Sequence, residues 1–347
     1  MKLLVQGSPM GMMPHYISAT RGAHAPTLRE LLDLLGDQAR AIDPVGLRQY
    51  FDRHPDGERT CFQEAKLLPA GSDLYCDGEN LRCHGRRLPL PQGSLLSLLE
   101  HALQESLICA DKVAVALSGG LDSALVFALT RRVTGKAVPV VTLATRLPGY
   151  CELEQTLENA RLLGIDSVEV IEANEADLIS ALPDAIAGCE TPLFNLHPVS
   201  KLLLAREVSH RGYDALLTGD GADQVFAASD PRNYLPIVGA IVRATGLTLL
   251  SPFLDERVVG WAKCHGTDPE KTALRQAAAA LLPAELVWCK KTPRLAPDFD
   301  LTGYRDHQLE SQLAPRLGLP LPNSQPGPQQ TLWATTAMLA RHLGGTC

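Results

Sequence analysis

Two glycine-containing, acidic turns hold most of the side chains with which this chain could do chemistry. The first reads Ser-Gly-Gly-Leu-Asp-Ser at residues 118–123, and the second reads Thr-Gly-Asp-Gly-Ala-Asp-Gln-Val-Phe at residues 218–226. Each follows a short apolar run, and the first also opens a predicted helix. Backbone N–H groups and the positive end of the helix dipole face outward at such a junction, so the first turn suits an anion such as phosphate. A glycine-rich turn that only caps a helix is the simpler alternative.

The acidic residues of the two turns indicate a metal ion. A carboxylate repels a phosphate group unless a cation lies between them, and Mg²⁺ prefers such oxygen ligands. We therefore predict that Asp122 and Asp223 hold Mg²⁺ beside a bound nucleotide, with hydroxyl donors from Ser118 and Ser123. A solvated acidic turn is the alternative for residues 218–226.

The segments around these turns alternate between strand and helix patterns. The alternation predicts an α/β fold, a doubly wound parallel sheet covered by helices on both faces, with a helical region from about residue 255 onward. Because the carboxyl ends of parallel strands share one edge of a sheet, the two turns should lie side by side. The predicted strands are residues 113–117, 138–143, 167–171 and 215–218, and the predicted helices are 95–107, 122–133, 152–163 and 198–211.

A break divides the chain near residues 88–93, where two prolines and a glycine interrupt regular structure. Before it, residues 27–52 have a helical pattern and residues 60–87 have the short apolar pieces and turns of β-hairpins. We predict a small, structural α+β domain at residues 1–92 and a nucleotide-binding domain at residues 93–347.

The first turn resembles the signature of the PP-loop ATP pyrophosphatases, which split ATP into AMP and pyrophosphate, and no Walker-A run is present. The second turn resembles the corresponding loop of the asparagine synthetase group, which includes the β-lactam synthetases. Further segments resemble that group in the expected order, so that the resemblance covers about residues 94–295. These segments are residues 149–154, 251–259, 271–275 with 281–285, and 288–293.

This resemblance implies that a substrate carboxylate attacks the α-phosphate of ATP and that an amine then attacks the acyl-adenylate. Lys291 matches the catalytic lysine of the group when Trp288 is the anchor, although an exposed pair with Lys290 is the alternative. Asp220 stands where asparagine synthetases carry Glu and β-lactam synthetases carry Tyr. It is predicted to act as a general base or to orient the amine.

The predicted sites comprise ATP, Mg²⁺ and substrate contacts. Asn195 and His197 lie at the start of a predicted helix, and for His197 a cap or a satisfied hydrogen-bond partner is the alternative role. Arg257 and Arg275 suit either a substrate carboxylate or structural ion pairs. The catalytic residues are Lys291 and Asp220; the nucleotide residues are Leu117, Ser118, Gly119, Gly120, Asp122, Ser123, Leu143, Thr218 and Gly219; the Mg²⁺ ligands are Asp122 and Asp223; the substrate residues are Glu152, Asn195 and His197.

The nitrogen source follows from what the start of the chain resembles. Glutamine-dependent asparagine synthetases begin with Met and Cys, whereas Lys2 follows Met1 here, and residues 41–71 resemble only the last part of their glutaminase domain. Glutamine is therefore not expected as the donor. Free ammonia, a separate amine and the substrate's own amine all remain open; we favour the last, because a built-in amine has a high effective concentration.

Composition excludes several other classes. The formal net charge of −7 disfavours a nucleic-acid partner. The same negative charge and the absence of a Cys-x-x-Cys pair among the nine cysteines disfavour a tRNA-modifying PP-loop enzyme. A nucleotide-binding protein without turnover is disfavoured by Asp122, Asp223 and Lys291. No run reaches the roughly 18 apolar residues of a membrane span, so we expect a cytoplasmic enzyme of small, amino-acid-derived substrates. A homodimer is an open alternative.

Overall fold

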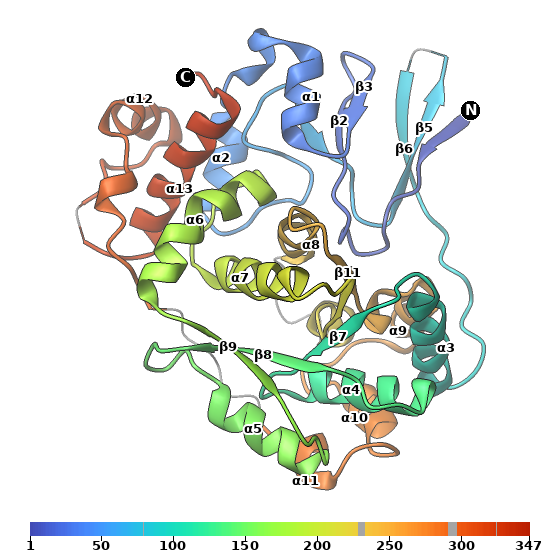
Figure 1. Ribbon diagram of the computed structural model, residues 1–347. Coiled ribbons are helices and arrows are strands. Elements are labelled where there is room, and N and C mark those ends of the chain that lie inside the picture. Colours follow the sequence, from blue (N-terminus) through green and yellow to red (C-terminus); the bar gives the residue numbers. More distant parts are fainter. Residues whose placement is uncertain (79, 228–232, 291–296, 324) are drawn as a thin grey trace.

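A five-stranded, fully parallel sheet forms the centre of the protein in a computed structural model, which describes residues 1–78, 80–227, 233–290, 297–323 and 325–347 (Figure 1). Its strand order is β11-β10-β7-β8-β9. The chain builds β7, β8 and β9 outward in one direction and then returns to place β10 on the other side of β7. This is the doubly wound order that the sequence predicted. The strands are β7 Val113–Ala116, β8 Val140–Thr145, β9 Glu169–Ala173, β10 Ala215–Leu217 and β11 Thr248–Leu250.

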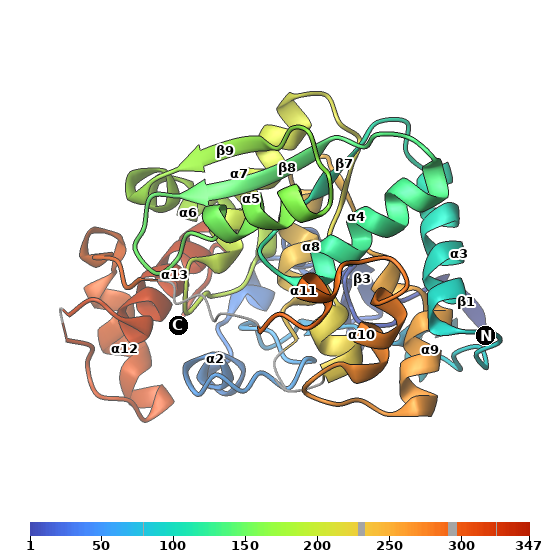
Figure 2. The same cartoon turned by 90° about the horizontal axis from the view of Figure 1, so that it is seen from below.

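Helices cover both faces of this sheet, as Figures 1 and 2 show. One face packs against α3, α4 and α9 to α11, through a core that includes Val115, Leu117 and Leu217. The other face packs against α7 and α8 through a core that includes Ala114, Val141 and Leu216. Successive strand residues thus point to opposite cores. The helices are α3 Leu95–Ile108, α4 Leu121–Thr134, α5 Leu153–Leu162, α6 Glu175–Cys189, α7 His197–His210, α8 Leu235–Arg243, α9 Glu256–His265, α10 Thr272–Ala278 and α11 Ala284–Val287.

The N-terminal segment packs along α6 and the C-terminal helices and shares one large core with them. Two small antiparallel sheets, of order β1-β5-β6 and β3-β2-β4, stand beside short helices there. The C-terminal end joins the same region, because Thr346 accepts a hydrogen bond from the backbone of Ile42 at 2.8 Å. The elements are β1 Lys2–Val5, β2 Tyr16–Ser18, β3 Ala23–Ala25, α1 Leu28–Leu35, α2 Pro44–Phe51, β4 Lys66–Leu67, β5 Ser72–Asp77, β6 Asn80–Gly85, α12 His307–Leu317 and α13 Pro328–Leu343.

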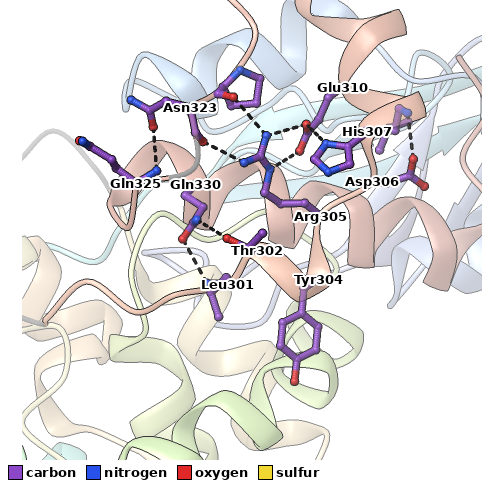
Figure 3. A network of polar contacts seen from close by, with 12 residues as sticks. Leu301, Thr302, Tyr304, Arg305, Asp306, His307, Glu310, Asn323, Gln325 and Gln330 are labelled. Atoms are coloured by element: carbon purple, nitrogen blue, oxygen red, sulfur yellow. Dashed lines mark hydrogen bonds and ion pairs between the residues drawn. The ribbon is translucent and has the colours of Figure 1, made fainter.

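A buried ion pair organises the C-terminal region. Arg305 binds both oxygens of Glu310 at 2.6 and 2.7 Å, and their side chains are 4% and 3% exposed (Figure 3). The same guanidinium donates to the carbonyl oxygens of Pro322 and Asn323. A pair buried this deeply needs such additional hydrogen bonds to offset the loss of water. Through Arg305, the segment that follows α12 is hydrogen-bonded to the residues at the start of that helix.

Several predicted boundaries shift for local reasons. The helical pattern of residues 27–52 is interrupted at Gly36, whose φ of 81° is left-handed, and α2 starts afresh with Pro44 in its first turn. The strand predicted at residues 138–143 begins at Val140, because Pro139 has no N–H for the ladder. Sequence reasoning overlooked α6, which contains Pro183, although Asn174 and Asp177 form a capping box at its start.

No helix among the described residues is both long and apolar enough to cross a bilayer.

A carboxylate at the end of α6 connects the N-terminal segment to the part of the chain that contains the parallel sheet. Glu190 is buried and takes the left-handed conformation, with φ 52°, at the C-terminal cap of α6. Its two oxygens accept the backbone N–H groups of Leu28 and Arg29, at 2.5 and 2.9 Å, at the start of α1. Burial raises the pKa of Glu190, and the two N–H donors oppose that effect.

Replacing Glu190 by Gln is expected to lower the free energy of unfolding by about 1–2 kcal/mol at pH 7, because the amide NH₂ then faces one of the two N–H donors. The raised pKa means that the folded protein binds this proton more tightly than the unfolded chain does. The stability of the wild type relative to Glu190→Gln should therefore be greatest below the ordinary carboxyl pKa and should decline as the pH rises through the folded-state pKa.

Urea denaturation at a series of pH values measures this difference. Glu175→Gln, at the exposed start of the same helix, is the matched control and should change the free energy of unfolding by less than about 0.5 kcal/mol. A wild-type advantage that grew with rising pH would contradict this account of Glu190.

Candidate functional site

The two glycine-containing turns lie against each other at the carboxyl ends of neighbouring strands. β7 and β10 are paired in parallel, with Val115 opposite Leu217, so both turns leave the sheet at one edge. Gly219 is essential to their approach: a Cβ atom there would lie 2.9 Å from both the Cβ atom of Asp122 and the backbone nitrogen of Ser123. Only glycine allows this contact without displacing a backbone. This edge is also where the strand order reverses, the usual ligand position in open α/β sheets.

Lys271 joins the acidic residues of the two turns. Its ammonium nitrogen lies 2.8 and 2.7 Å from the two carboxylate oxygens of Asp122 and 2.8 Å from Oδ1 of Asp223. Asp223 opens a π-helical turn, Asp223–Ala227, and Lys271 takes the left-handed conformation (φ 52°) just before α10. The two predicted metal ligands therefore converge on a single cation.

The charge of Lys271 is maintained by its partners. Burial of its side chain by itself lowers the pKa of Lys271, but the carboxylates of Asp122 and Asp223 outweigh burial and hold that pKa above its ordinary value. The ammonium group is therefore charged at neutral pH. Sequence reasoning assigned no role to Lys271, although its segment was part of the family resemblance; its approach to both turns depends on how α10 packs.

The first turn is closed by its two serines. The backbone nitrogen of Ser118 donates to Oγ of Ser123 at 3.0 Å, and the two hydroxyl oxygens lie 2.9 Å apart. Gly120 occupies the N-cap position of α4, and no side chain among the described residues caps that helix. The positive end of the α4 dipole thus faces the loop, which is favourable for phosphate.

The remaining residues predicted to bind the nucleotide differ in how deeply they are buried. Leu117 and Thr218 are buried at the strand ends, with their backbone nitrogens bonded to neighbouring strands. Leu143 lies inside β8 and packs toward the core shared with α7. Glu152, predicted to contact substrate, directly precedes α5 and lies beside the first turn, where its Cβ atom would be 3.8 Å from a Cβ atom on Gly119.

Asp220 is paired with a lysine from α7. Lys201 Nζ lies 2.8 Å from Oδ2 of Asp220. The backbone nitrogen of Asp220 donates to Oγ1 of Thr218 at 3.3 Å, and its carbonyl oxygen accepts a hydrogen bond from Ser251 at 2.6 Å. The main chain of Asp220 is thereby fixed next to the turn contact. Sequence reasoning missed Lys201, because a lysine in a helix 19 residues upstream carries no local signal of this pairing.

Asn195 and His197 lie at the start of α7. Oδ1 of Asn195 accepts a hydrogen bond from the backbone nitrogen of His197 at 3.1 Å, in the turn just before the helix, whose N-cap residue is Leu196. Asn195 also lines a mostly apolar hollow with about 430 Å³ of empty space, part of it open to solvent, between α7 and the chain after α2. The ring of His197 bonds to the hydroxyl of Tyr150 at 2.9 Å, and that hydroxyl lies 2.9 Å from Oγ of Ser200.

Lys291 lies outside the described residues, so its catalytic assignment stays a prediction. Lys290 beside it is exposed. Arg275 supports the chain that leads there, because its guanidinium donates to the carbonyl oxygens of Val287 and Cys289. Arg257 binds the carboxylates of Asp255 and Glu105. Both arginines therefore have the structural partners that one of their two predicted roles requires.

Within the described part of the chain, no group of three or more His, Cys, Asp or Glu side chains could hold a metal by itself. The two carboxylates of Asp122 and Asp223 are nevertheless a suitable partial set, because Mg²⁺ commonly takes one or two protein carboxylates and completes its shell with phosphate oxygens and water. Their shared contact with Lys271 shows that this position already accommodates a cation.

Comparison with known proteins identifies similar chains. Residues 94–241 match the family model of asparagine synthase. Asparagine synthetase B (glutamine-hydrolyzing) of Escherichia coli is 24% identical over 279 residues, which cover 65% of this chain and 50% of that protein. An amidase of Gibberella zeae is 29% identical over 132 residues, or 34% of this chain and 20% of that protein. This chain thus spans about half the length of the first relative and a smaller part of the second.

Among solved structures, the NH₃-dependent NAD synthetase from Campylobacter jejuni is similar to 65% of this chain over 92% of its own length, with 16% identity and a TM-score of 0.35.

Lys271→Met is expected to destabilise the protein, because Asp122 and Asp223 lose their shared cation. We expect the free energy of unfolding to fall by about 2 kcal/mol, below the 3–5 kcal/mol typical of a fully buried pair, since the Asp223 side chain is 41% exposed. Urea denaturation without Mg²⁺ or nucleotide measures the loss. Lys271→Arg, which keeps the charge, should recover part of it, and unchanged stability of Lys271→Met would show that the contact contributes nothing.

Proposed function

We propose that the chain is an ATP-dependent synthetase that forms an amide bond, a function supported by the match of residues 94–241 to the family model of asparagine synthase. In this proposal a substrate carboxylate attacks the α-phosphate of ATP, giving an acyl-adenylate and pyrophosphate. An amine then attacks the acyl carbon and releases AMP. The observation that supports this function best is the meeting of the two turns, with Asp122 and Asp223 sharing one cation beside the uncapped start of α4.

The residues of this edge suit a magnesium nucleotide. Ser118, Gly119 and Gly120 would contact phosphate oxygens through backbone N–H groups and hydroxyls, while Asp122 and Asp223 would hold Mg²⁺. When bound, Mg²⁺ supplies positive charge that stabilises the departing pyrophosphate. Lys271 keeps the two carboxylates converged before the nucleotide arrives, and its fixed charge lies where negative charge accumulates.

Asp220 is the proposed residue of the amine step. Its carboxylate would take a proton from the substrate's ammonium group and leave a neutral amine. The amine nitrogen then forms a bond to the acyl carbon, the bond from that carbon to the AMP oxygen breaks, and AMP leaves with the electron pair while the second amine proton passes to solvent. Thr218 and Ser251 fix the main chain of Asp220, and Lys201 pairs with its carboxylate.

We favour an amine that belongs to the activated molecule itself, as in β-lactam formation. A built-in amine reaches the acyl carbon at a high effective concentration and avoids the entropy cost of a second substrate. Free ammonia, as in an ammonia-dependent asparagine synthetase, is the second candidate.

Incubation of the chain with radiolabelled ATP, Mg²⁺ and a panel of amino acids and diamino acids tests the function. We expect AMP and pyrophosphate to form only with particular carboxylates, together with substrate-dependent exchange of pyrophosphate into ATP. Mass spectrometry should then find a product that has lost one water from a single substrate. Formation of ADP instead of AMP would refute the proposal, and a response to added RNA alone would favour a tRNA-modifying enzyme.

A pair of neighbouring lysine variants provides the control for this assay. Lys291→Ala should abolish product formation while ATP still binds, because the family resemblance assigns the catalytic charge to Lys291. Lys290→Ala, at the exposed neighbour, should keep most of the activity. Normal activity of Lys291→Ala would remove Lys291 from the mechanism.

A further inference from the structure

The apolar hollow beside α7 is built by three segments that are far apart in the sequence. The end of α2 and the residues after it contribute Tyr50 and Arg53, the residues before α7 contribute Phe194 and Asn195, and the start of α8 contributes Tyr234. The empty space is about 430 Å³, and part of it is open to solvent. A hollow of this size with a mostly apolar lining and a few polar groups is typical of sites that bind small organic molecules.

Aromatic rings form much of the wall of this hollow. The rings of Phe194 and Tyr234 pack against each other with their centroids 5.8 Å apart and their planes inclined by 53°. Tyr50 adds a third ring from the N-terminal segment. None of these three residues is fully buried. Aromatic rings in this tilted arrangement attract a further ring by their edges and faces, so the wall favours an aromatic ligand over an aliphatic one.

Arg53 places a positive charge beside these rings. Its guanidinium carbon lies 5.6 Å from the centroid of the Phe194 ring, which positions the charge by a cation–π contact. The residue is exposed, and no carboxylate in the described part of the chain forms an ion pair with it. Its fork of N–H donors is therefore available to a carboxylate brought by a ligand.

The backbone of Arg53 also singles this residue out. Its φ of 58° is left-handed, a conformation that favours glycine and strains other residues. Among the described residues, two others that are not glycine have such a φ, namely Glu190 and Lys271. Each of those two uses its charged side chain to hold partners from distant segments. Strain of this kind is often found at functional positions, and a ligand contact gives Arg53 a corresponding use.

Asn195 supplies a second donor to the hollow. Its Oδ1 accepts the backbone N–H of His197, so the side-chain NH₂ group is the part left to bind a ligand. Within the described residues, that NH₂ group has no other hydrogen-bond partner. The polar groups at Arg53 and Asn195 are thus both donors. Together they suit an acceptor with one negative charge, which a single guanidinium can balance.

We propose that this hollow is a binding site for an aromatic carboxylic acid. The ring lies among Tyr50, Phe194 and Tyr234, and the carboxylate accepts hydrogen bonds from Arg53 and Asn195. None of the described residues that line the hollow belongs to the turns at residues 118–123 and 218–226. The site is therefore distinct from the nucleotide edge, and the inference goes beyond the proposed function and does not depend on it.

Binding of three matched probes tests the site without turnover. 3-Phenylpropionate and 3-phenylpropan-1-ol share the ring and differ in the carboxylate, whereas butyrate keeps the carboxylate and lacks the ring. Calorimetry or ligand-observed NMR with the full chain, in the absence of ATP and Mg²⁺, measures their affinities. We expect 3-phenylpropionate to bind at least about fivefold more tightly than the alcohol, because of its charged hydrogen bonds. It should bind at least about tenfold more tightly than butyrate, because of its ring.

Substitutions of Arg53 separate recognition from folding. Arg53→Gly removes the guanidinium group and suits the left-handed φ, so the midpoint of thermal unfolding should stay within about 3 °C of the wild type. The same variant should lose the preference for 3-phenylpropionate over the alcohol. Arg53→Lys, which keeps the charge, should retain most of that preference. Arg87→Gln changes an exposed arginine outside the hollow and is the matched control, with affinities equal to those of the wild type.

A substitution in the aromatic wall tests the other half of the site. Phe194→Leu keeps an apolar side chain but removes one ring, and it should weaken the binding of both phenyl probes by about threefold. Equal affinity of the wild type for the acid and the alcohol, or no saturable binding of 3-phenylpropionate, would overturn the proposal. A preference for the acid that survives in Arg53→Gly, or that is lost equally in Arg87→Gln, would overturn it as well.

Discussion

The contact of Lys271 with Asp122 and Asp223 is the interaction on which the site depends. Two carboxylates brought together at a sheet edge repel each other, and burial increases the cost of each charge. A single ammonium group, 2.7–2.8 Å from both side chains, offsets that cost. Because Lys271 precedes α10, the helical region after residue 255 helps to set the geometry of a site whose two acidic turns follow strands of the parallel sheet.

Packing elsewhere in the molecule holds the elements around that contact in place. Gly219 allows the two turns to touch. On the α7 and α8 face of the sheet, Leu216 of β10 packs into the core that these helices share. Glu190 connects α6, the helix before α7, to the start of α1 in the N-terminal segment. The N-terminal segment packs against α7 through a core that both share. From α7, Lys201 forms its ion pair with Asp220.

Both charged clusters of the site use lysine to control a carboxylate, with different exposure. The Lys271 side chain is 9% exposed and keeps two aspartates converged, whereas the Lys201 side chain is 21% exposed and pairs with a single aspartate. The Lys271 cluster suits a permanent arrangement, because its central ammonium group is buried between two carboxylates. The more accessible pair contains Asp220, the residue proposed for the amine step. This division separates the two proposed steps, activation of a carboxylate and attack by an amine.

The sequence by itself determined the parallel α/β fold and the position of both turns, because apolar runs, glycines and helix starts are local signals that the backbone must obey. It also singled out Asp122 and Asp223 by residue type and position, and Asp220 through the family resemblance. Only the tertiary structure decided which cations meet these carboxylates. Lys271 follows Asp122 by 149 residues, and Lys201 precedes Asp220 by 19. Such pairings depend on how helices pack against the sheet. Sequence periodicity does not predict which carboxylate a lysine far away in the chain will contact.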